Sequence, residues 1–271
     1  MKIYLYGPSG SGKTTIGFQL ARDLGIPFYD TDQLIEAKYK KTIAEIFQSE
    51  GEDTFRAYEA KVLEEISVWE DGVIALGGGA LLQRENRDLV ERSGTVICLM
   101  ASMPVLIERV RQENGTRPLL AGEVEEKLSK MMAKRGPHYS SFRNQLLTDG
   151  LSPQTASWKI QCMVGRFKIE GMGNAYEVWI EPGLISLIGK KMIQLGLKGP
   201  VAIITDSNIA PIYAEWLMDV IRQEGYQVAA KALPAGENSK TIYRAMELWK
   251  FFVEMKLERG STVIALGGGV V

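Results

Sequence analysis

The sequence predicts an α/β protein built on parallel sheets, because short apolar runs alternate with amphipathic stretches along its whole length. Its 271 residues exceed the usual size of one domain, so two units are expected. A third observation is the glycine-rich segment at residues 7–14, directly after the first apolar run. A glycine loop between a strand and a helix is a common phosphate site in parallel sheets, so the first unit is predicted to bind a phosphorylated ligand.

The first unit is predicted to span residues 1–167. Its five strands are predicted at Lys2–Tyr6, Pro27–Tyr29, Val73–Leu76, Thr95–Leu99 and Gln145–Leu147. Amphipathic patterns predict helices at Lys13–Leu24, Thr54–Trp69, Met103–Gln112 and Val124–Lys134. The polar segment Gln112–Glu123 joins the last two helices and carries glycines and a proline. It is a candidate lid, with a plain surface loop as the alternative.

A linker at 168–173 is predicted to lead into a second unit at 174–271. Strands are expected at Tyr176–Ile180, Val201–Thr205, Gln227–Ala232 and Thr262–Leu266, with helices at Leu184–Leu195, Ala210–Glu224 and Ile242–Met255. The last strand runs into a glycine turn, and no helix follows to cover the sheet. We therefore expect a partial Rossmann-like domain in a chain that is a fragment of a longer protein.

The composition argues against several classes of function. A net charge of -1, from 32 basic and 33 acidic residues, gives no broad attraction to nucleic acid or to a membrane surface. No apolar stretch is long enough to cross a bilayer. The only cysteines, Cys98 and Cys162, lie far apart, which argues against a disulfide framework and suits the cytoplasm. His138 is the single histidine, so this chain cannot supply a metal site of two or three histidines.

The segment from Gly7 to Thr14 reads GPSGSGKT and matches the phosphate-loop pattern G-x-x-x-x-G-K-[ST]. A nucleotide such as ATP would lie against the loop and the start of the following helix, at Gly10, Ser11, Gly12, Lys13, Thr14 and Thr15. Lys13 would reach the β- and γ-phosphates, and the Thr14 hydroxyl would hold Mg²⁺. A plain glycine turn is the alternative.

Two further segments follow predicted strands at the same edge of the sheet. Asp30-Thr31-Asp32 offers two carboxylates for Mg²⁺ or for a substrate hydroxyl, although either aspartate could instead cap a helix. Gly77-Gly78-Gly79 brings bare backbone close to the sheet, or forms a simple tight turn. Arg117, in the candidate lid, could close over the phosphates.

Six motifs in order resemble those of shikimate kinases over about residues 1–165: GPSGSGKT, Asp30-Thr31-Asp32, Phe55-Arg56-x-x-Glu59, Gly77-Gly78-Gly79, Thr116-Arg117-Pro118-Leu119-Leu120 and Arg135-x-x-x-Tyr139. The resemblance implies phosphorylation of shikimate by ATP and Mg²⁺, with Lys13, Asp32 and Arg117 in catalytic roles. It also implies that Asp32 takes substrate hydroxyls, that Arg56 and Arg135 clamp the carboxylate, and that Gly78 and Gly79 line the pocket. Asp30 would place Mg²⁺ through water. Tyr139 is followed by Ser140-Ser141-Phe142, where the family pattern has an acidic residue and an alanine.

The second unit resembles the nucleotide-binding part of 3-dehydroquinate synthases, through Thr205-Asp206-Ser207-Asn208, Pro234-Ala235-Gly236-Glu237-x-x-Lys240 and the terminal Ala265-Leu266-Gly267-Gly268-Gly269-Val270-Val271. The resemblance implies NAD contacts from Asp206, Asn208, Glu237, Lys240, Gly268 and Gly269. That family also uses a divalent metal, zinc or cobalt, whose ligands include histidines of a carboxyl-terminal domain. The second unit should therefore be catalytically incomplete, and the whole protein bifunctional, with a homo-oligomer conceivable through this domain.

Two other readings of the first unit stay open at this point. A kinase for gluconate or a nucleoside monophosphate would share the phosphate loop. A nucleotide-binding switch or assembly module would lack an acceptor, although the Asn-Lys-x-Asp motif of GTPases is absent from the sequence.

Overall fold

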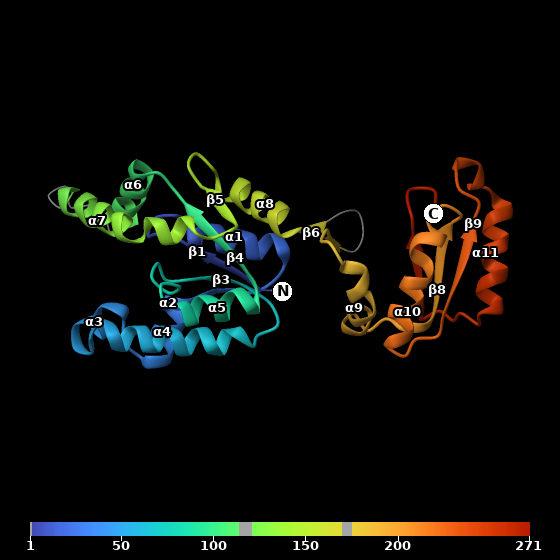
Figure 1. Ribbon diagram of the computed structural model, residues 1–271, viewed down its shortest axis with the longest axis horizontal. Coiled ribbons are helices and arrows are strands. Elements are labelled where there is room, and N and C mark those ends of the chain that lie inside the picture. The colour runs from blue at the N-terminus through green and yellow to red at the C-terminus, as the bar shows by residue number, and fades with distance from the viewer. Residues whose placement is uncertain (1, 114–120, 170–174) are drawn as a thin grey trace. The chain divides into compact units, whose positions relative to one another are not determined.

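The computed structural model describes residues 2–113, 121–169 and 175–271, and of residues 113 and 121–123 only the backbone. The chain divides into two compact units, residues 1–180 and 181–271, each described here by itself (Figure 1). The predicted linker at 168–173 overlaps the segment 170–174, which lies outside the described residues. The domain limits 1–167 and 174–271 therefore stay a prediction.

The first unit is built on a five-stranded parallel sheet in the order β2-β3-β1-β4-β5. The strands are β1 (Lys2–Tyr6), β2 (Phe28–Asp30), β3 (Gly72–Ala75), β4 (Thr95–Met100) and β5 (Gln145–Leu147). All five predicted strands are confirmed, with ends shifted by one residue where they differ. Because β1 lies between β3 and β4, the loop that follows β1 emerges at the middle of the sheet, where ligands bind in folds of this type.

Helices cover both faces of this sheet (Figure 1). They are α1 (Lys13–Leu24), α2 (Thr31–Tyr39), α3 (Ile43–Ser49), α4 (Gly51–Ser67), α5 (Arg84–Ser93), α6 (Met103–Glu113), α7 (Ala121–Ser140) and α8 (Pro153–Val164). A hydrophobic core lies on each face of the sheet, and successive side chains of β1 point alternately into one and the other. Ile3 and Leu5 pack with α1 and α8, whereas Tyr4 and Tyr6 pack on the side of α4 and α5.

Four of these helices, α2, α3, α5 and α8, were not predicted from the periodicity. Two of them begin at strong local signals. At α3, the Thr42 side chain and Glu45 form a capping box, and at α8 the Ser152 hydroxyl caps a helix that starts with Pro153. The short α5 has a highly polar sequence, RENRDLVERS, in which the apolar period is hard to recognise. The predicted helix at Val124–Lys134 is longer at both ends and includes Pro137.

The strand predicted at Tyr176–Ile180 is confirmed as β7 (Tyr176–Trp179), but it does not join the three-stranded sheet of the second unit, where it was predicted to lie. It pairs antiparallel with β6 (Arg166–Ile169). The Arg166 guanidinium lies 4.7 Å from the centre of the Trp179 ring, a cation–π contact across the first pair of the hairpin. A strand pattern predicts extended backbone but does not identify the partner, and this partner is the neighbouring strand in the sequence.

The second unit has a three-stranded parallel sheet in the order β10-β8-β9, formed by β8 (Lys198–Asp206), β9 (Val228–Leu233) and β10 (Ser261–Leu266). The helical elements are η2 (Leu184–Leu187), α9 (Ile188–Gln194), η3 (Ala210–Ala214), α10 (Glu215–Gln223), η4 (Glu237–Ser239) and α11 (Ile242–Glu254). Two predicted helices therefore begin irregularly, Leu184–Leu195 with a 3-10 turn and Ala210–Glu224 with a π turn. The buried core joins β8 to α9 and α10 through Met192, Val201, Ile203, Leu217 and Ile221.

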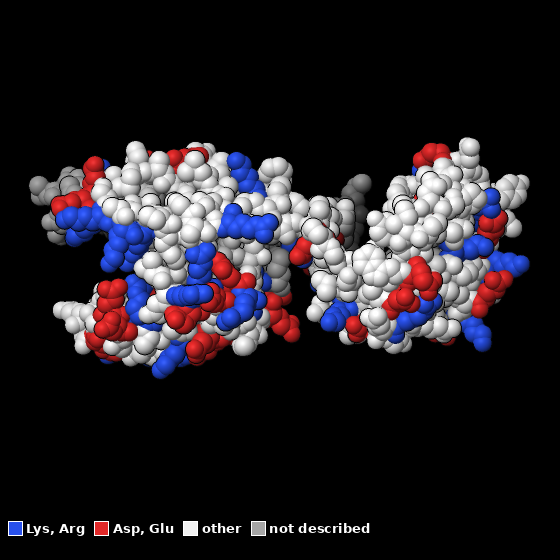
Figure 2. Space-filling model, in the orientation of Figure 1, with Lys and Arg blue, Asp and Glu red and all other residues white. Residues whose placement is uncertain are grey.

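Acidic and basic side chains are intermingled on the visible surface of each unit, in keeping with the net charge of -1 (Figure 2). Of the helices in the described ranges, none has the length and apolar character that a membrane crossing requires. Both cysteines are free thiols, Cys98 buried and Cys162 exposed.

Candidate active site

The phosphate loop connects β1 to α1, and its glycines are required by the backbone. Gly7, Gly10 and Gly12 have φ angles of 136°, 78° and 93°. A Cβ atom at Gly7 would lie 2.1 Å from the carbonyl oxygen of Leu99, so the loop is also packed closely against β4. The Lys13 Nζ donates to the carbonyl oxygens of Gly7 and Pro8, each at 3.0 Å, and so lies across the loop. The backbone therefore has the conformation that the motif predicts, with the lysine above it.

Residues outside the motif support this loop from the opposite side. Arg109, in α6, donates to the carbonyl oxygen of Gly10 at 3.3 Å and to Thr148 Oγ1 at 2.9 Å. Thr148, fully buried after β5, donates in turn to the carbonyl oxygen of Ser11 at 3.2 Å. Sequence reasoning missed both residues, because a single arginine and a single threonine carry no pattern.

The two aspartates after β2 have different surroundings, although their position after the strand does not distinguish them. Asp30 Oδ1 caps α2 by accepting from the backbone N–H of Asp32 at 3.0 Å, and its Oδ2 accepts from Thr14 Oγ1 at 2.9 Å. A hydroxyl and a carboxylate at this distance are oxygen donors of the kind that Mg²⁺ binds, so Thr14 and Asp30 fit the predicted metal position. The Asp32 carboxylate takes no part in the cap. Burial raises the pKa of Asp32 above its usual 3.8, and the charge of Asp30 adds to this, whereas Lys13 and Arg56 oppose it.

Thr31, between these aspartates, fixes the glycine turn that follows β3. Its buried hydroxyl donates to the carbonyl oxygen of Ala75 at 3.2 Å and accepts from the N–H of Gly77 at 3.0 Å. A Cβ atom at Gly77 would lie 2.7 Å from Glu59 Oε1 and 3.2 Å from Asp32 Oδ1. Only glycine therefore allows the turn to approach both carboxylates.

Arg56 reaches the same turn from α4. A Cβ atom at Gly79 would lie 2.8 Å from its Nη2. The guanidinium donates to Glu59 Oε2 at 2.7 Å and to Glu52 Oε1 at 3.1 Å. Glu59 is only 1% exposed, and its Oε1 has no hydrogen-bond partner among the residues that the structure describes. Burial raises the pKa of Glu59 and the neighbouring Arg56 lowers it, with a net rise above 4.5. Glu59 was recognised in the motif, but its role as the partner of Arg56 was not predicted.

Arg135 and Tyr139 approach from α7, one turn apart on the same side of the helix. The Tyr139 hydroxyl donates to the carbonyl oxygen of Gly78 at 2.7 Å. Burial raises the pKa of Tyr139, while the charge of Arg135 and a hydrogen bond with it act in the opposite direction. The charge of Arg135 also reaches Glu59. Asp32, Arg56, Gly78, Gly79 and Arg135 therefore gather around one glycine turn beside the phosphate loop.

The segment after Tyr139 departs from the family pattern and is well packed. The helix ends at Ser140, and the Phe142 ring is buried beneath the Arg87 guanidinium at 4.0 Å. Arg87 also donates to Ser141 Oγ at 2.7 Å. A serine and an aromatic ring thus hold the end of α7 in this chain.

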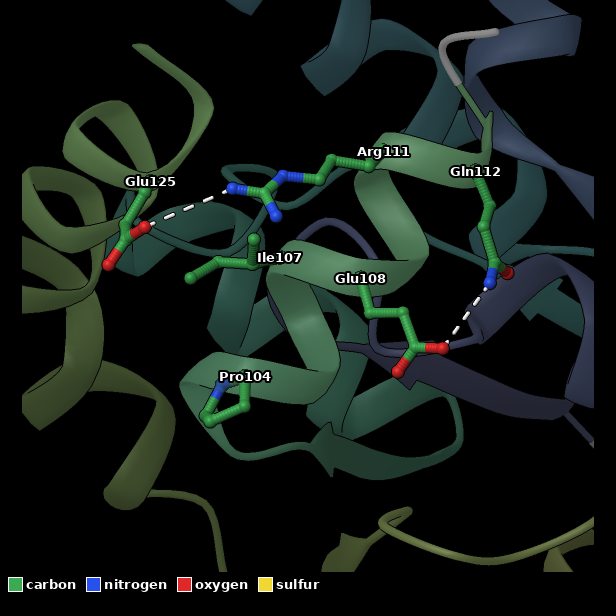
Figure 3. Close-up of a pocket in the computed structure, with 6 residues that line it drawn as sticks. All are labelled: Pro104, Ile107, Glu108, Arg111, Gln112 and Glu125. Carbon is green, nitrogen blue, oxygen red and sulfur yellow. Dashed lines mark hydrogen bonds and ion pairs between the residues drawn. The ribbon is translucent and has the colours of Figure 1, made fainter. Parts of the chain in front are cut away.

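Arg117 and most of the predicted lid lie outside the described residues. Between α6 and α7 there is a hollow of about 470 Å³ (Figure 3). It is lined by Pro104, Ile107, Glu108, Arg111, Gln112 and Glu125, with the Arg111 guanidinium 3.9 Å from Glu125 across it. None of the predicted site residues lines this hollow. It is therefore separate from the acceptor cluster, by which we mean Asp32, Arg56, Gly78, Gly79 and Arg135.

In the second unit, the predicted residues follow the carboxyl ends of the three parallel strands. Asp206 ends β8, and its Oδ1 accepts from the N–H groups of Asn208 and Ile209 at 2.8 and 3.1 Å. A Cβ atom at Gly267, after β10, would lie 3.5 Å from Asp206 Oδ2. The exposed Gly268 and Gly269 continue this turn. After β9, the exposed residues Glu237 and Lys240 form an ion pair at 3.0 Å.

The described residues contain no group of three or more His, Cys, Asp and Glu side chains placed to hold a metal ion. The zinc or cobalt implied by the second resemblance therefore does not fit the residues of this unit.

The first unit thus combines a phosphate loop on a five-stranded parallel sheet with a carboxylate and the Arg56 guanidinium at the neighbouring glycine turn. This combination is typical of a small-molecule kinase. The comparisons with known proteins are more specific. The shikimate kinase family model matches residues 9–163, and the chain belongs to this family.

The similar proteins bear this out. The chain is 40% identical over 167 residues to a shikimate kinase of Gloeobacter violaceus, covering 61% of this chain and 94% of that protein. Among solved structures, a shikimate kinase from Bacteroides thetaiotaomicron has a TM-score of 0.56 at 32% identity, covering 60% of this chain and 97% of that one. A shikimate kinase from Acinetobacter baumannii in complex with shikimate has a TM-score of 0.55 at 37% identity, covering 60% and 92%.

The second unit has relatives of its own. Residues 230–271 match the family model of the 3-dehydroquinate synthase N-terminal region. The whole chain is 31% identical to the bifunctional shikimate kinase/3-dehydroquinate synthase of Thermotoga maritima, and it spans 51% of the length of that protein.

Proposed function

We propose that this chain transfers the γ-phosphate of ATP to a hydroxyl of shikimate. The observation that carries the proposal is the convergence of Asp32, Arg56 and the Gly77–Gly79 turn directly beside the phosphate loop. An acceptor with hydroxyls and a carboxylate meets complementary groups here, since aspartate accepts from hydroxyls and guanidinium groups bind carboxylates. Gluconate kinases and nucleotide-binding modules share the loop, but the six motifs and the shikimate kinase relatives favour shikimate.

Each residue acts by position and charge. Lys13 neutralises the transferring phosphoryl group, and Arg56 and Arg135 hold the acceptor carboxylate. Asp32 accepts the hydroxyl proton, a role helped by the raised pKa that makes its carboxylate a better base. Mg²⁺, held by Thr14 and through water by Asp30, would supply charge neutralisation of the phosphates. Arg117 would cover the phosphates from the lid.

The relative from Thermotoga maritima is about twice as long as this chain, which matches 51% of its length. By analogy with that bifunctional relative, the whole protein would add 3-dehydroquinate synthase activity. In this proposal the complete second domain of the whole protein binds NAD, with contacts from Asp206, Asn208, Glu237, Lys240, Gly268 and Gly269, and the metal ligands come from elsewhere. Two free cysteines are consistent with the predicted cytoplasmic location.

The test is ADP production by the purified chain with ATP and Mg²⁺, with shikimate compared with gluconate, nucleoside monophosphates and other hydroxy acids. The proposal expects stimulation by shikimate well above every other acceptor. Stronger stimulation by gluconate or a nucleotide would reassign the acceptor. Slow hydrolysis that no acceptor stimulates would indicate a binding module.

A further inference from the structure

Two buried tyrosines hold the carbonyl oxygen of Gly78. Tyr139 Oη donates to it at 2.7 Å and Tyr6 Oη at 3.3 Å, and both side chains are completely shielded from solvent. Their rings also lie together, with centres 5.3 Å apart. Tyr6 is the last residue of β1 and directly precedes Gly7 of the phosphate loop, whereas Tyr139 lies in the last turn of α7. One carbonyl group therefore joins the strand that leads into the loop to the helix that follows the lid segment.

Because the Gly78 carbonyl is held by the tyrosines, the direction of the next N–H group, that of Gly79, is also fixed. The peptide between Gly78 and Gly79 is planar, so its C=O and N–H point in opposite directions. With the C=O held by the tyrosines, the N–H of Gly79 points away from them, and the backbone of Gly79 lies against the Arg56 guanidinium. Gly79 is buried, yet among the described residues no acceptor is found for its N–H. A buried donor of this kind is available to a ligand.

The same turn also touches the phosphate side of the site. A Cβ atom at Gly78 would lie 3.4 Å from the carbonyl oxygen of Gly7 and 3.9 Å from the backbone nitrogen of Ser9. Tyr139 in addition shares a hydrogen bond with Arg135, the second predicted carboxylate clamp. A shift of the Gly78 carbonyl would therefore move the N–H of Gly79 and the hydrogen-bond partner of Arg135.

We propose that Tyr139, supported by Tyr6, is a positioning residue for the phosphoryl acceptor, because it orients the Gly78–Gly79 peptide so that the Gly79 N–H faces the acceptor beside Arg56. This inference rests on the proposed function for the identity of the acceptor. Neither tyrosine touches the reacting atoms, so both act through the peptide. Tyr139 has the shorter bond and contributes more.

The test is Tyr139→Phe, which removes one hydroxyl and keeps the ring. Loss of a net hydrogen bond of ordinary strength predicts a KM for shikimate raised about three- to tenfold, with the KM for ATP within about twofold. Tyr6→Phe should raise the KM for shikimate less. Tyr4→Phe is the matched control, because Tyr4 is equally buried on the same strand but its hydroxyl bonds Ser93 Oγ at 2.8 Å, outside the acceptor cluster. Its KM values should equal those of the wild type at a comparable loss of stability.

A second measurement does not depend on the reaction. Hydrogen–deuterium exchange of a peptide spanning residues 76–82 should be at least about threefold faster in Tyr139→Phe than in the wild type, and unchanged in Tyr4→Phe. Unaltered exchange, or a KM for shikimate that moves no more than in the control, would overturn the inference. A wild-type chain that fails to phosphorylate shikimate would instead refute the proposed function, and the exchange rates would still decide whether the tyrosines hold the turn.

Discussion

Glu59→Gln tests the acceptor side of the site most directly. Glu59 is 1% exposed and accepts from Arg56 Nη1 at 2.7 Å, so its charge acts on the guanidinium with little screening by water. Glutamine has nearly the same shape and keeps an oxygen acceptor, but it lacks the charge. The substitution therefore weakens the orientation of Arg56 without opening a cavity.

The expected size follows from the kind of bond that changes. A hydrogen bond to a charged group contributes about 1.5–3 kcal/mol and a neutral one about 0.5–1.5 kcal/mol. The difference of about 1–1.5 kcal/mol corresponds to a KM for shikimate raised roughly five- to twelvefold, if the loss appears wholly in acceptor binding. The KM for ATP should change less than twofold, since Arg56 lies at the glycine turn.

The assay is steady-state kinetics with each substrate varied in turn, and Glu52→Gln is the control. Glu52 contacts the same guanidinium at 3.1 Å, but its side chain is 61% exposed, and exposed ion pairs contribute little. The control should therefore shift the KM for shikimate less than twofold. Equal effects of the two substitutions would show that burial of Glu59 is irrelevant. A rise confined to the KM for ATP would refute the assignment of Arg56.

Four further predictions follow from the site. Lys13→Ala should abolish phosphoryl transfer with an unchanged circular dichroism spectrum, and near wild-type turnover would contradict the role of Lys13. Arg135→Ala should raise the KM for shikimate about ten- to a hundredfold, through loss of a charge-assisted partner, and an unchanged KM would remove it from the clamp. Because the folded pKa of Asp32 is raised, kcat/KM should fall on acidification with a midpoint above 3.8, and a lower midpoint would exclude Asp32 as the base. Finally, this 271-residue chain should show no 3-dehydroquinate synthase turnover with added NAD and zinc or cobalt. Calorimetry should show weak or no NAD binding. Cyclisation of the seven-carbon phosphate substrate would contradict the assignment.

The fold of the first unit was predictable where a pattern repeats. Buried strands are short apolar runs, and the phosphate loop has fixed spacing, so both were located to within a residue. The order β2-β3-β1-β4-β5 was not predictable in the same way, because pairing depends on contacts between segments far apart in the sequence. The misassigned strand Tyr176–Ile180 shows the same limit, since its alternating pattern fits a hairpin as well as a sheet edge.

The site was predictable where residues belong to a motif and not where they support one. Position after the strand does not distinguish Asp30 from Asp32. The structure distinguishes them because Asp30 caps α2 and accepts from Thr14, whereas burial raises the pKa of Asp32. Thr31, Arg109 and Thr148 support the loop and the turn through hydrogen bonds of isolated polar side chains, and an isolated polar residue has no spacing to recognise. The capping box of Thr42 and Glu45 is a signal for the start of α3 that can be recognised in the sequence.

The sequence Val-Ile-Ala-Leu-Gly-Gly-Gly occurs twice, at 73–79 and 263–269, and the two copies show how neighbours give a turn its chemistry. In both places a parallel strand ends in glycines that approach a carboxylate, Asp32 and Glu59 at Gly77, and Asp206 at Gly267. In the first unit β3 pairs with β1, so the turn lies beside the phosphate loop and gains Arg56 from α4. In the second, β10 pairs with β8, which ends in Asp206 and leads to no phosphate loop. The glycines allow close approach in each case, and the adjacent strand determines which groups surround them.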